Sequence, residues 1–445
     1  MKKFSVLFFL FVLAGSLSAQ TIFYVKKSGD NAWEGRSNVY TDNIQSAIDA
    51  AAAQAGEQNA QVWIAKGEYT LTTTLTPQSG VDVIGGFVGT ETDLSKRSFV
   101  GKGANQTILV GGNNIRPITQ TADLAEPCFW TNLVITKGSI LESDGEGGGA
   151  LLNSGMTLKG CIIRDNEAAI GGGVCLKGNA QLINCLVENN PYNDAGKGRG
   201  IFCENDTKVI NCTVIDNSPP HICYGCDPST GDGIYAKDNA FIANTISYGN
   251  KPRMQGAPSN QQIYVVSGSN VTITYCAISE GDGSLEKIAT HSVVLAKNPT
   301  NYNSESRKGN FELYINNKEG VSSCIDAGSN DFVTEELDLN GYNRIILGGF
   351  DALVPIVDIG AFEFDPDYYV GIEKNVADAV VLYPNPASDN IVLEGIDEGA
   401  YTIANAVGVT ISGGLYQGDA IDISTLQQGF YFISIDNRTI PFVKK

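Results

Sequence analysis

The feature that most constrains the fold of this chain is a short phrase that recurs along it. The phrase has a strand-like apolar stretch, then a small residue, then an asparagine or glycine five positions later. Copies stand at 129–138, 156–166, 181–190, 208–217, 241–250 and 271–281. Fixed segments separated by one variable loop per period are typical of a stacked repeat protein.

Aligned copies place similar residues in three columns. The first column is Leu133, Cys161, Cys185, Cys212, Thr245 and Cys276; the second is Gly138, Asn166, Asn190, Asn217, Asn250 and Gly281; the third is Gly149, Gly173, Gly200 and Gly233. The segments between them are rich in β-branched and aromatic residues and are bounded by Gly, Asn and Asp, so they are predicted strands. Several short strands per period and no helical periodicity favour a parallel β-helix, with equivalent side chains stacked about 4.8 Å apart.

The columns then have a structural meaning. The cysteines are expected as an interior stack of small, buried, free thiols. Stacked side chains run parallel, which opposes disulfides, and one thiol per coil does not make a metal cluster. The asparagines are expected at a bend, in left-handed backbone geometry, each hydrogen-bonded to the same residue of the next coil.

The N-terminal region carries two further signals. Residues 1–19 have two lysines, an apolar run and small residues up to Ala19, which predicts a secretory signal peptide. No later stretch is apolar enough to cross a bilayer, so no transmembrane segment is expected in the mature chain. The stretch 41–55 has Asp42 and Gln45 at capping-box spacing and an apolar stripe, which predicts an amphipathic helix over the first coil.

The amino-acid composition limits the kinds of partner that the chain is expected to bind. Acidic residues number 49 and basic residues 30, for a formal charge of −19, so nucleic acid is not expected as a partner. The hydrophobic fraction of 42% argues against disorder, and the 50 glycines indicate many turns.

Two regions resemble a known family. "FYVKKSGDNAWEG", "VWIAKGEYTL" and "VIGGFVGTETDLSKR" are similar to the start of bacterial right-handed parallel β-helix proteins of the pectin-lyase-like superfamily. "SSCIDAGSND", "DLNGYNRI" and "VDIGAFEF" resemble the final coils of choice-of-anchor Q proteins. The resemblance implies an N-terminal cap and first coils in 20–100, and a β-helix body with closing coils in 101–365.

The C-terminal segment differs in kind and resembles the sorting domain of type IX secretion cargo. The matching residues are Tyr383, Pro384, Asn385, Pro386, Gly429, Lys444 and Lys445. Alternating strands and turns predict a small β-sandwich at 373–445 after a linker at 366–372. The resemblance implies translocation across the outer membrane by the type IX machinery to the cell surface or the extracellular space. It also implies removal of the domain and attachment to surface lipopolysaccharide.

Catalytic chemistry has few candidates. Only His221 and His291 are present, and neither a G-x-S-x-G elbow nor an H-E-x-x-H motif occurs. Lyases of the resembled superfamily need an acidic calcium cluster and a basic residue; the catalytic candidates are Arg164, Asp165, Glu188 and Asp216. The calcium candidates are Asp165, Asp216, Asp338 and Asn340. The alternative is that these are polar turn residues facing water.

The variable loops supply binding candidates, since loops on a rigid scaffold commonly carry function. Tyr192, Arg199, Tyr224 and Arg253 have aromatic and cationic groups suited to sugars. Cys223 and Cys226 form a local disulfide or stay reduced. The leading hypothesis is a displayed, non-catalytic β-helix protein acting as an adhesin, a glycan-binding protein or a structural surface component, with glycans or a host surface as partners. The alternative is a calcium-dependent polysaccharide lyase acting on acidic glycans.

Overall fold

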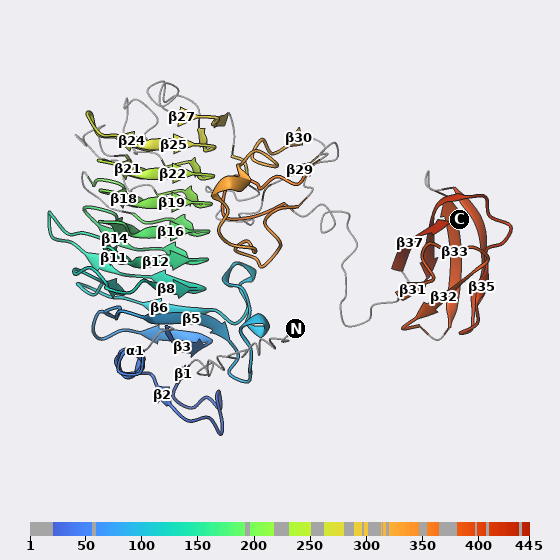
Figure 1. The fold of residues 1–445 in the computed structure, drawn as a ribbon, viewed down its shortest axis with the longest axis horizontal. Helices are drawn as coiled ribbons and strands as arrows, with labels where there is room; N and C mark the ends of the chain where they lie inside the picture. The colour runs from blue at the N-terminus through green and yellow to red at the C-terminus, as the bar shows by residue number, and fades with distance from the viewer. Residues whose placement is uncertain are drawn as a thin grey trace, which may run out of the picture. The chain divides into compact units, whose positions relative to one another are not determined.

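The computed structural model of the chain divides into two compact units between Phe364 and Asp365. It describes residues 21–55, 59–191, 196–217, 231–250, 262–279, 289–295, 298–300, 313, 315–316, 320–346, 354–364, 381–396, 398–405, 409–435 and 438–445. The predicted signal peptide at 1–19 and linker at 366–372 lie outside these residues. Figure 1 shows the first unit as a stack of short strands and the second as a separate set of longer strands.

The first unit is a parallel β-helix built from three sheets (Figure 1). Coils in the middle of the stack contribute one strand to each sheet, and strands of successive coils pair in parallel. Leu158, Leu182, Val209, Ile242 and Ile273 share one register position. Sheet 1 contains β2 (Val39–Thr41), β1 (Ile22–Lys26), β3 (Ala60–Ala65), β5 (Val81–Phe87), β8 (Cys128–Thr131), β12 (Met156–Lys159), β16 (Gln181–Ile183), β19 (Lys208–Ile210), β22 (Phe241–Ala243), β25 (Thr272–Thr274) and β27 (Ala289–Thr290).

The strands of the other two sheets follow those of sheet 1 along the chain. Sheet 2 contains β4 (Gly67–Thr70), β6 (Thr107–Val110), β9 (Leu133–Thr136), β13 (Ile162–Arg164), β17 (Leu186–Glu188), β20 (Thr213–Ile215), β23 (Ile246–Tyr248), β26 (Ala277–Ser279) and β28 (Val293–Leu295). Sheet 3 contains β7 (Ile118–Thr119), β11 (Ala150–Leu152), β15 (Val174–Leu176), β18 (Ile201–Cys203), β21 (Ile234–Ala236) and β24 (Ile263–Val265). Short parallel strands β10 (Ser139–Ile140) and β14 (Glu167–Ala168) pair with each other.

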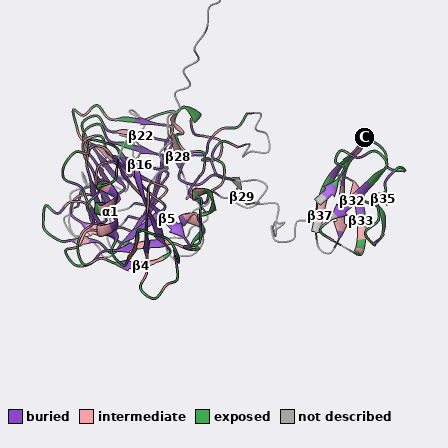
Figure 2. Ribbon diagram, turned by 60° about the horizontal axis from the view of Figure 1, so that its bottom comes forward, coloured by how far each residue is buried: buried purple, intermediate pink, exposed green. Residues whose placement is uncertain are grey.

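One continuous apolar core fills the interior of the coils from Phe23 to Ile278. Figure 2 shows this buried interior in purple, with exposed residues on the outer turns. Strand alternation sends one set of side chains into the core and the other set outward. The regular stacking that the sequence columns predict is therefore the packing of the core.

Helix α1 (Ile44–Ala52) covers the N-terminal end of this core with the predicted stripe of Ile44, Ala47, Ile48 and Ala51. The predicted cap was wrong. Asn43 is the N-cap, and its side chain accepts a hydrogen bond from the backbone N–H of Ser46 at 3.0 Å. Asp42 instead adopts a left-handed conformation with φ 53° and pairs with Lys27, so its carboxylate is not available to the helix.

The cysteine column lies at the corner between sheets 1 and 2. Cys161, Cys185, Cys212 and Cys276 are buried and unbridged. Each thiol donates to the carbonyl oxygen two residues earlier, at 3.2 to 3.3 Å, and the hydroxyl of Thr245 makes the same bond at 2.8 Å. Burial raises the pKa of Cys276 to about 12, so this thiol stays protonated. These positions of the column therefore hold side chains that are small and that can donate a hydrogen bond.

The asparagine column forms a buried hydrogen-bonded ladder after sheet 2. The side-chain N–H groups of Asn166, Asn190 and Asn217 donate to the side-chain oxygen of the next asparagine at 3.0, 2.9 and 2.9 Å. Asn250 continues the ladder to Gln262 at 2.9 Å, a member that the sequence columns did not reveal. The ladder is therefore an internal spine of satisfied amides.

The expected left-handed geometry belongs to the residues just before these asparagines. Asp165, Asn189, Asp216 and Gly249 have φ values of 55°, 47°, 56° and 69°. Asn, Asp and Gly adopt this region at low cost. The expectation that the ladder asparagines themselves are left-handed was wrong. The left-handed residue stands one position before the asparagine that forms the ladder.

The glycine column packs directly against the ladder. A Cβ on Gly200 would lie 2.6 Å from the carbonyl oxygen of Gly233 and 3.0 Å from the amide nitrogen of Asn217. The same contacts recur for Gly149 with Asn166 and for Gly173 with Asn190. This packing explains why the spacing between glycine and asparagine is fixed.

The described residues 322–346 and 354–364, hereafter the strap, pack against the side of the coils. Leu339, Ala361 and Phe362 pack on outward-facing Val134, Ile162, Leu186 and Ile215 of sheet 2. The strap therefore runs beside earlier coils, as Figure 1 shows in orange. It contains the short helix η5 (Asn330–Phe332) and follows the hairpin of β29 (Ile315–Asn316) and β30 (Gly320–Val321). Helices η1 (Leu94–Lys96) and η2 (Val100–Lys102) lie in the first coils.

The second unit is a small antiparallel β-sandwich. One sheet contains β31 (Val381–Tyr383), β32 (Asn390–Glu394) and β35 (Ile421–Asp422); the other contains β34 (Thr410–Tyr416), β33 (Gly399–Asn405), β36 (Gly429–Ile435) and β37 (Arg438–Lys444). Ile391, Ile403 and Ile433, from both sheets, share one core. Among the described residues of the chain, no helix is long and apolar enough to cross a membrane.

Candidate functional site

The stacked acidic residues proposed for catalysis lie in turns. Asp165 is exposed and accepts a hydrogen bond from the side-chain amide of Asn189, its neighbour one coil on. Asp216 occupies the same turn position in the following coil. The left-handed backbone at all three positions gives a structural reason for Asp and Asn there.

Arg164 lies beside this column on β13. Its Nη1 is 3.8 Å from the Oε1 of Glu188, the residue paired with it on the neighbouring strand β17. The ion pair joins two candidates predicted for catalysis. Across the described ranges, no three His, Cys, Asp or Glu side chains are grouped so that they could hold a metal ion.

Asp338 and Asn340 were predicted as calcium ligands, but the structure buries both in the strap, with exposed fractions of 2% and 4%. The Asp338 carboxylate accepts hydrogen bonds from the backbone N–H groups of Asn340, Tyr342 and Glu363 at 2.9, 2.7 and 2.9 Å. Burial raises the pKa of Asp338 to about 6, against the lowering effect of these bonds. Its carboxylate shapes the turn of the strap.

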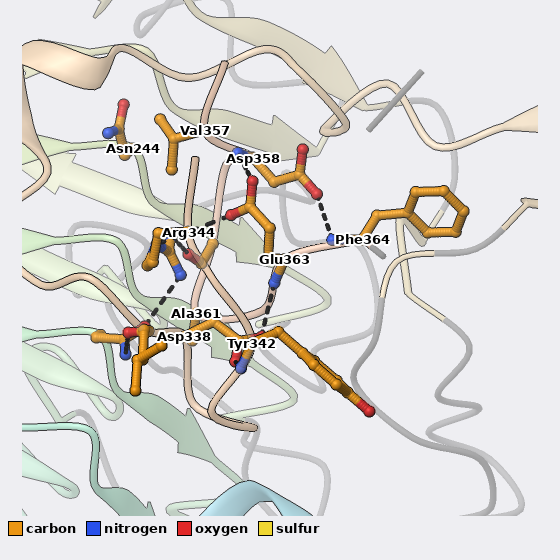
Figure 3. Close-up of polar contacts among 12 residues, drawn as sticks. Asn244, Asp338, Tyr342, Arg344, Val357, Asp358, Ala361, Glu363 and Phe364 are labelled. Atoms are coloured by element: carbon orange, nitrogen blue, oxygen red, sulfur yellow. Dashed lines mark hydrogen bonds and ion pairs between the residues drawn. The ribbon is translucent and has the colours of Figure 1, made fainter. Parts of the chain in front are cut away.

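Asp338 belongs to a buried polar cluster that locks the strap (Figure 3). Arg344 donates to the Asn184 side-chain oxygen at 3.0 Å and to the Gly360 carbonyl at 2.7 Å, and its Nε lies 3.9 Å from Glu363. The Asp358 carboxylate accepts from Asp326 N and Phe364 N at 2.7 and 2.6 Å. Three buried carboxylates thus surround one guanidinium, and the sequence showed only Asp338 among them.

Of the four predicted sugar-binding residues, Arg199 requires a correction. It is only 1% exposed and forms a buried ion pair with Asp232, one coil on. Both residues directly precede glycines of the third column, so that spacing was the signal for their pairing. Tyr192, Tyr224 and Arg253, together with Cys223 and Cys226, lie outside the described residues.

A pocket of about 500 Å³ lies where the strap crosses the corner between sheets 1 and 2. Its lining includes Arg97, Lys159, Asn184, Thr334, Glu335 and Glu336. Lys159 Nζ lies 2.7 Å from Glu335 Oε1 and 4.3 Å from the centre of the Phe129 ring. The pocket therefore offers cations, carboxylates and hydroxyl groups together.

A row of aromatic rings begins just before this stretch of the strap. The Phe332 ring centre lies 5.4 Å from that of Phe241 and 6.2 Å from that of Tyr275, and Tyr275 stacks on His291 at 4.8 Å. His291 is exposed and the other three rings are half-buried. Phe332 and the pocket residue Thr334 are two positions apart, so the strap connects the rings to the pocket.

The residues of the predicted sorting signal meet in the second unit. Asn385 accepts a hydrogen bond from the backbone of Val443 at 3.0 Å and donates to the carbonyl of Pro441 at 3.2 Å. Ala387 bridges to Lys444, and Gly429 pairs with Lys444 across β36 and β37. Tyr383, Pro384 and Pro386 are exposed next to this contact. Separate motifs in the sequence thus form one end of the sandwich.

Comparisons with known proteins bear on the second unit. Residues 381–445 match the family model described as a secretion system C-terminal sorting domain. No curated protein matches the chain. One solved structure, a crystal structure of the pectate lyase Pel9A, aligns with a TM-score of 0.31 and 13% identity over 79% of this chain and 98% of that chain. At that TM-score the likeness carries no argument about function.

The match covers the strands and the signal residues of the second unit. A sorting domain is an address read by an export machinery. Residues 381–445 are therefore a C-terminal sorting domain of type IX secretion, and the protein is exported across the outer membrane to the cell surface or the extracellular space.

Proposed function

We propose that the first unit is a non-catalytic, surface-displayed module that binds saccharides, as an adhesin or glycan-binding protein. The observation that supports this best is the row of Phe241, Phe332, Tyr275 and His291, which adjoins the pocket along the strap. The C–H faces of sugar rings are apolar and pack on aromatic rings, while their hydroxyl groups need hydrogen-bonding partners. The strap supplies both kinds of group side by side.

The residues considered for catalysis or calcium binding have structural contacts that support a binding function over a lyase. Asp165 is held by Asn189, Arg164 faces Glu188, and Asp338 is saturated by backbone N–H groups. A proton-abstracting base needs access to its substrate. A rigid β-helix with a lateral binding face is well suited to display.

The test uses the purified exported protein and a glycan panel, with and without calcium. Tyr275→Asn and His291→Asn remove rings but keep the backbone, since Asn already occupies the equivalent left-handed positions at Asn184, Asn211 and Asn244. We expect the double variant to bind its saccharide about thirtyfold more weakly, since ring contacts contribute about 1 kcal/mol each.

The matched control is Tyr264→Ala, which removes a half-buried ring from sheet 3. It should leave saccharide affinity unchanged. Unsaturated uronate products that require calcium would contradict the proposal and favour the polysaccharide lyase. If the double variant and the unmodified protein bind the saccharide with equal affinity, the saccharide binds somewhere other than at the strap.

A further inference from the structure

The buried polar cluster that locks the strap contains more carboxylates than its cation balances (Figure 3). Asp338, Asp358 and Glu363 are at most 4% exposed, and Arg344 is 1% exposed. If all three carboxylates were ionised, three negative charges and one positive charge would leave a net charge of −2 with little access to water. Burying unbalanced charge is costly. The cluster is neutral only when two of its three carboxylates are protonated.

The same carboxylates hold distant parts of the strap together. The Asp358 carboxylate accepts hydrogen bonds from the backbone N–H groups of Asp326 and Phe364 at 2.7 and 2.6 Å. The Asp338 carboxylate accepts one from the backbone N–H of Glu363 at 2.9 Å. Stretches near the start, the middle and the end of the strap therefore meet at the groups whose charge is unbalanced.

The surroundings of the cluster leave this imbalance in place. Arg344 supplies the positive charge that acts on all three carboxylates, whereas Asp326 adds negative charge beside Asp358, next to the Cys324 thiol. The coils contribute neutral side chains: Asn184 accepts from Arg344 at 3.0 Å, and Thr213 accepts from the backbone N–H of Ala361 at 3.0 Å. Asp338 also lines the pocket, together with two cations and two further carboxylates: Arg97, Lys159, Glu335 and Glu336.

Burial therefore favours the protonated forms. It raises the pKa of Asp358 to about 7 and that of Asp338 to about 6, and it holds the pKa of Glu363 well above its usual value. The backbone hydrogen bonds oppose these shifts only in part. A closed strap then binds more protons than an open strap whose carboxylates face water. Closure is favoured at pH 5 and becomes less favourable as the pH rises toward 8.

We propose that the cluster of Asp338, Asp358, Glu363 and Arg344 is a proton-operated latch, which keeps the strap closed while it holds protons and opens it on losing them. Phe332 of the ring row and Thr334 of the pocket belong to the strap, so opening takes the saccharide-binding face apart. This regulation of binding rests on the proposed function, whereas the latch itself does not. The protein would hold its saccharide in mildly acidic surroundings and release it in mildly alkaline ones.

Hydrogen exchange of the purified exported protein, followed by mass spectrometry at pH 5 and pH 8, tests the latch. After correction for the intrinsic effect of pH, protection factors in peptides from 338–344 and 358–364 should fall about 100-fold between the two pH values. Peptides from strands β12 and β16 should keep their protection. Asp358→Asn should make the fall in the strap about tenfold smaller. Asp331→Asn, on an exposed residue of the strap outside the cluster, should show the full fall.

Each variant is compared with itself at the two pH values, so a strap that is weaker at both still reports on the latch. Asp338→Asn repeats the test if Asp358→Asn does not fold. Equal protection of the strap at pH 5 and pH 8 would overturn the latch. So would a fall in folded Asp358→Asn, or in its replacement, as large as that of the unmodified protein.

Isothermal titration at the same pH values tests the regulation. The probes are an oligogalactan, a xylo-oligosaccharide and a chito-oligosaccharide, which are neutral and keep their charge between pH 5 and pH 8. A probe that binds at pH 5 should bind at least about tenfold more weakly at pH 8. Histidine side chains gain charge in the same pH range; Asp358→Asn keeps His291 and should flatten the dependence if the latch causes it.

The outcomes separate the latch from the proposed function. Equal affinity at both pH values, or an undiminished pH dependence in Asp358→Asn, would overturn the regulation of binding. If no saccharide binds at either pH, the proposed function is refuted, and a pH-dependent loss of strap protection still supports the latch.

Discussion

Single amides determine how successive coils attach to each other. Asn190 donates through its side chain to the carbonyls of Ile163 and Glu188 and to Asn217, and its own oxygen accepts from Asn166. All of these groups are buried, so none can exchange its partner for water. Removing one asparagine would leave several buried polar groups without hydrogen-bond partners, which costs free energy. The ladder stabilises the fold because this cost is avoided.

Asn190→Ala should lower the free energy of unfolding by about 3 kcal/mol, because several buried polar groups would lose partners. Denaturant titration followed by circular dichroism measures this. The matched control is Asn239→Ala, which removes an exposed amide with one surface bond to Asp206; its effect should stay within about 0.5 kcal/mol. Similar losses in the two variants would show that the ladder has no special role.

The buried carboxylates of the strap predict a pH dependence of stability. Burial raises the pKa of Asp358 to about 7 and that of Asp338 to about 6, both from 3.8. Between pH 4 and pH 7 the folded state then binds more protons than the unfolded state, so stability should fall as pH rises. The expected loss is on the order of 6 kcal/mol across that window.

Unfolding midpoints at several pH values from 4.5 to 8 check this prediction. Asp358→Asn removes one titrating group and should flatten the curve, whatever its effect on absolute stability. Asp389→Asn, on a residue of the second unit, should leave the slope unchanged. A stability that rises from pH 5 to pH 7, or an identical slope in Asp358→Asn, would show that these carboxylates are ionised throughout.

At the scale of elements, the strap is the part of the first unit that does not repeat. It is attached to the coils through Lys159, Asn184, Thr213 and Asn244, one side chain at each of several levels. It also covers the outward face of sheet 2 with apolar residues. The strap thus positions the pocket and the ring row against the rigid coils.

Arg344→Met should release the strap, because it removes the ion-pair partner of buried Glu363 and the hydrogen bonds to Asn184 and Gly360. Removing one partner of a buried ion pair costs about 3–5 kcal/mol. We expect the strap to become susceptible to limited proteolysis within residues 322–364, while the coils stay resistant. Adding Glu363→Gln should recover part of the loss, and the exposed Arg36→Met is the control. Unchanged protease resistance in Arg344→Met would show that apolar packing alone holds the strap.

At the scale of the whole molecule, the two compact units separate function from export. The sandwich has its own core and antiparallel sheets, and it matches a sorting domain. The resemblance to type IX cargo further predicts that this domain is removed after translocation and that the mature protein attaches to surface lipopolysaccharide.

Deleting 370–445 should leave the β-helix stranded in the periplasm, because the export machinery loses the unit that it reads. Fractionation and immunoblotting measure this, with deletion of residues 1–19 as the control that blocks the earlier step. Mass spectrometry of surface material should find a mature C-terminus near 365–372. Recovery of a chain ending at Lys445 from the surface would mean that the domain is retained.

The sequence by itself determined the features that repeat or that match a motif. The parallel β-helix and the buried cysteine column followed from local spacing, because each coil interacts with the next at a fixed offset. The sorting domain followed from the resemblance of its motifs to a known family. The single-position error in the left-handed turn and the burial of Arg199 arose within that same pattern. The repeat spacing determines which residues of successive coils stack on each other. Only the backbone conformation decides which of two adjacent residues has its side chain inside the coil.

Only the tertiary structure decided where the strap lies and what it forms. The contacts of Lys159 with Glu335 and of Asn184 with Leu337 join residues 176 and 153 positions apart. Such contacts have no period and appear in no local pattern. The pocket, the ring row and the buried carboxylate cluster therefore arise where the non-repeating strap packs against the regular coils. The outer faces of the coils are similar from one coil to the next, so the repeat pattern alone does not show where the strap packs.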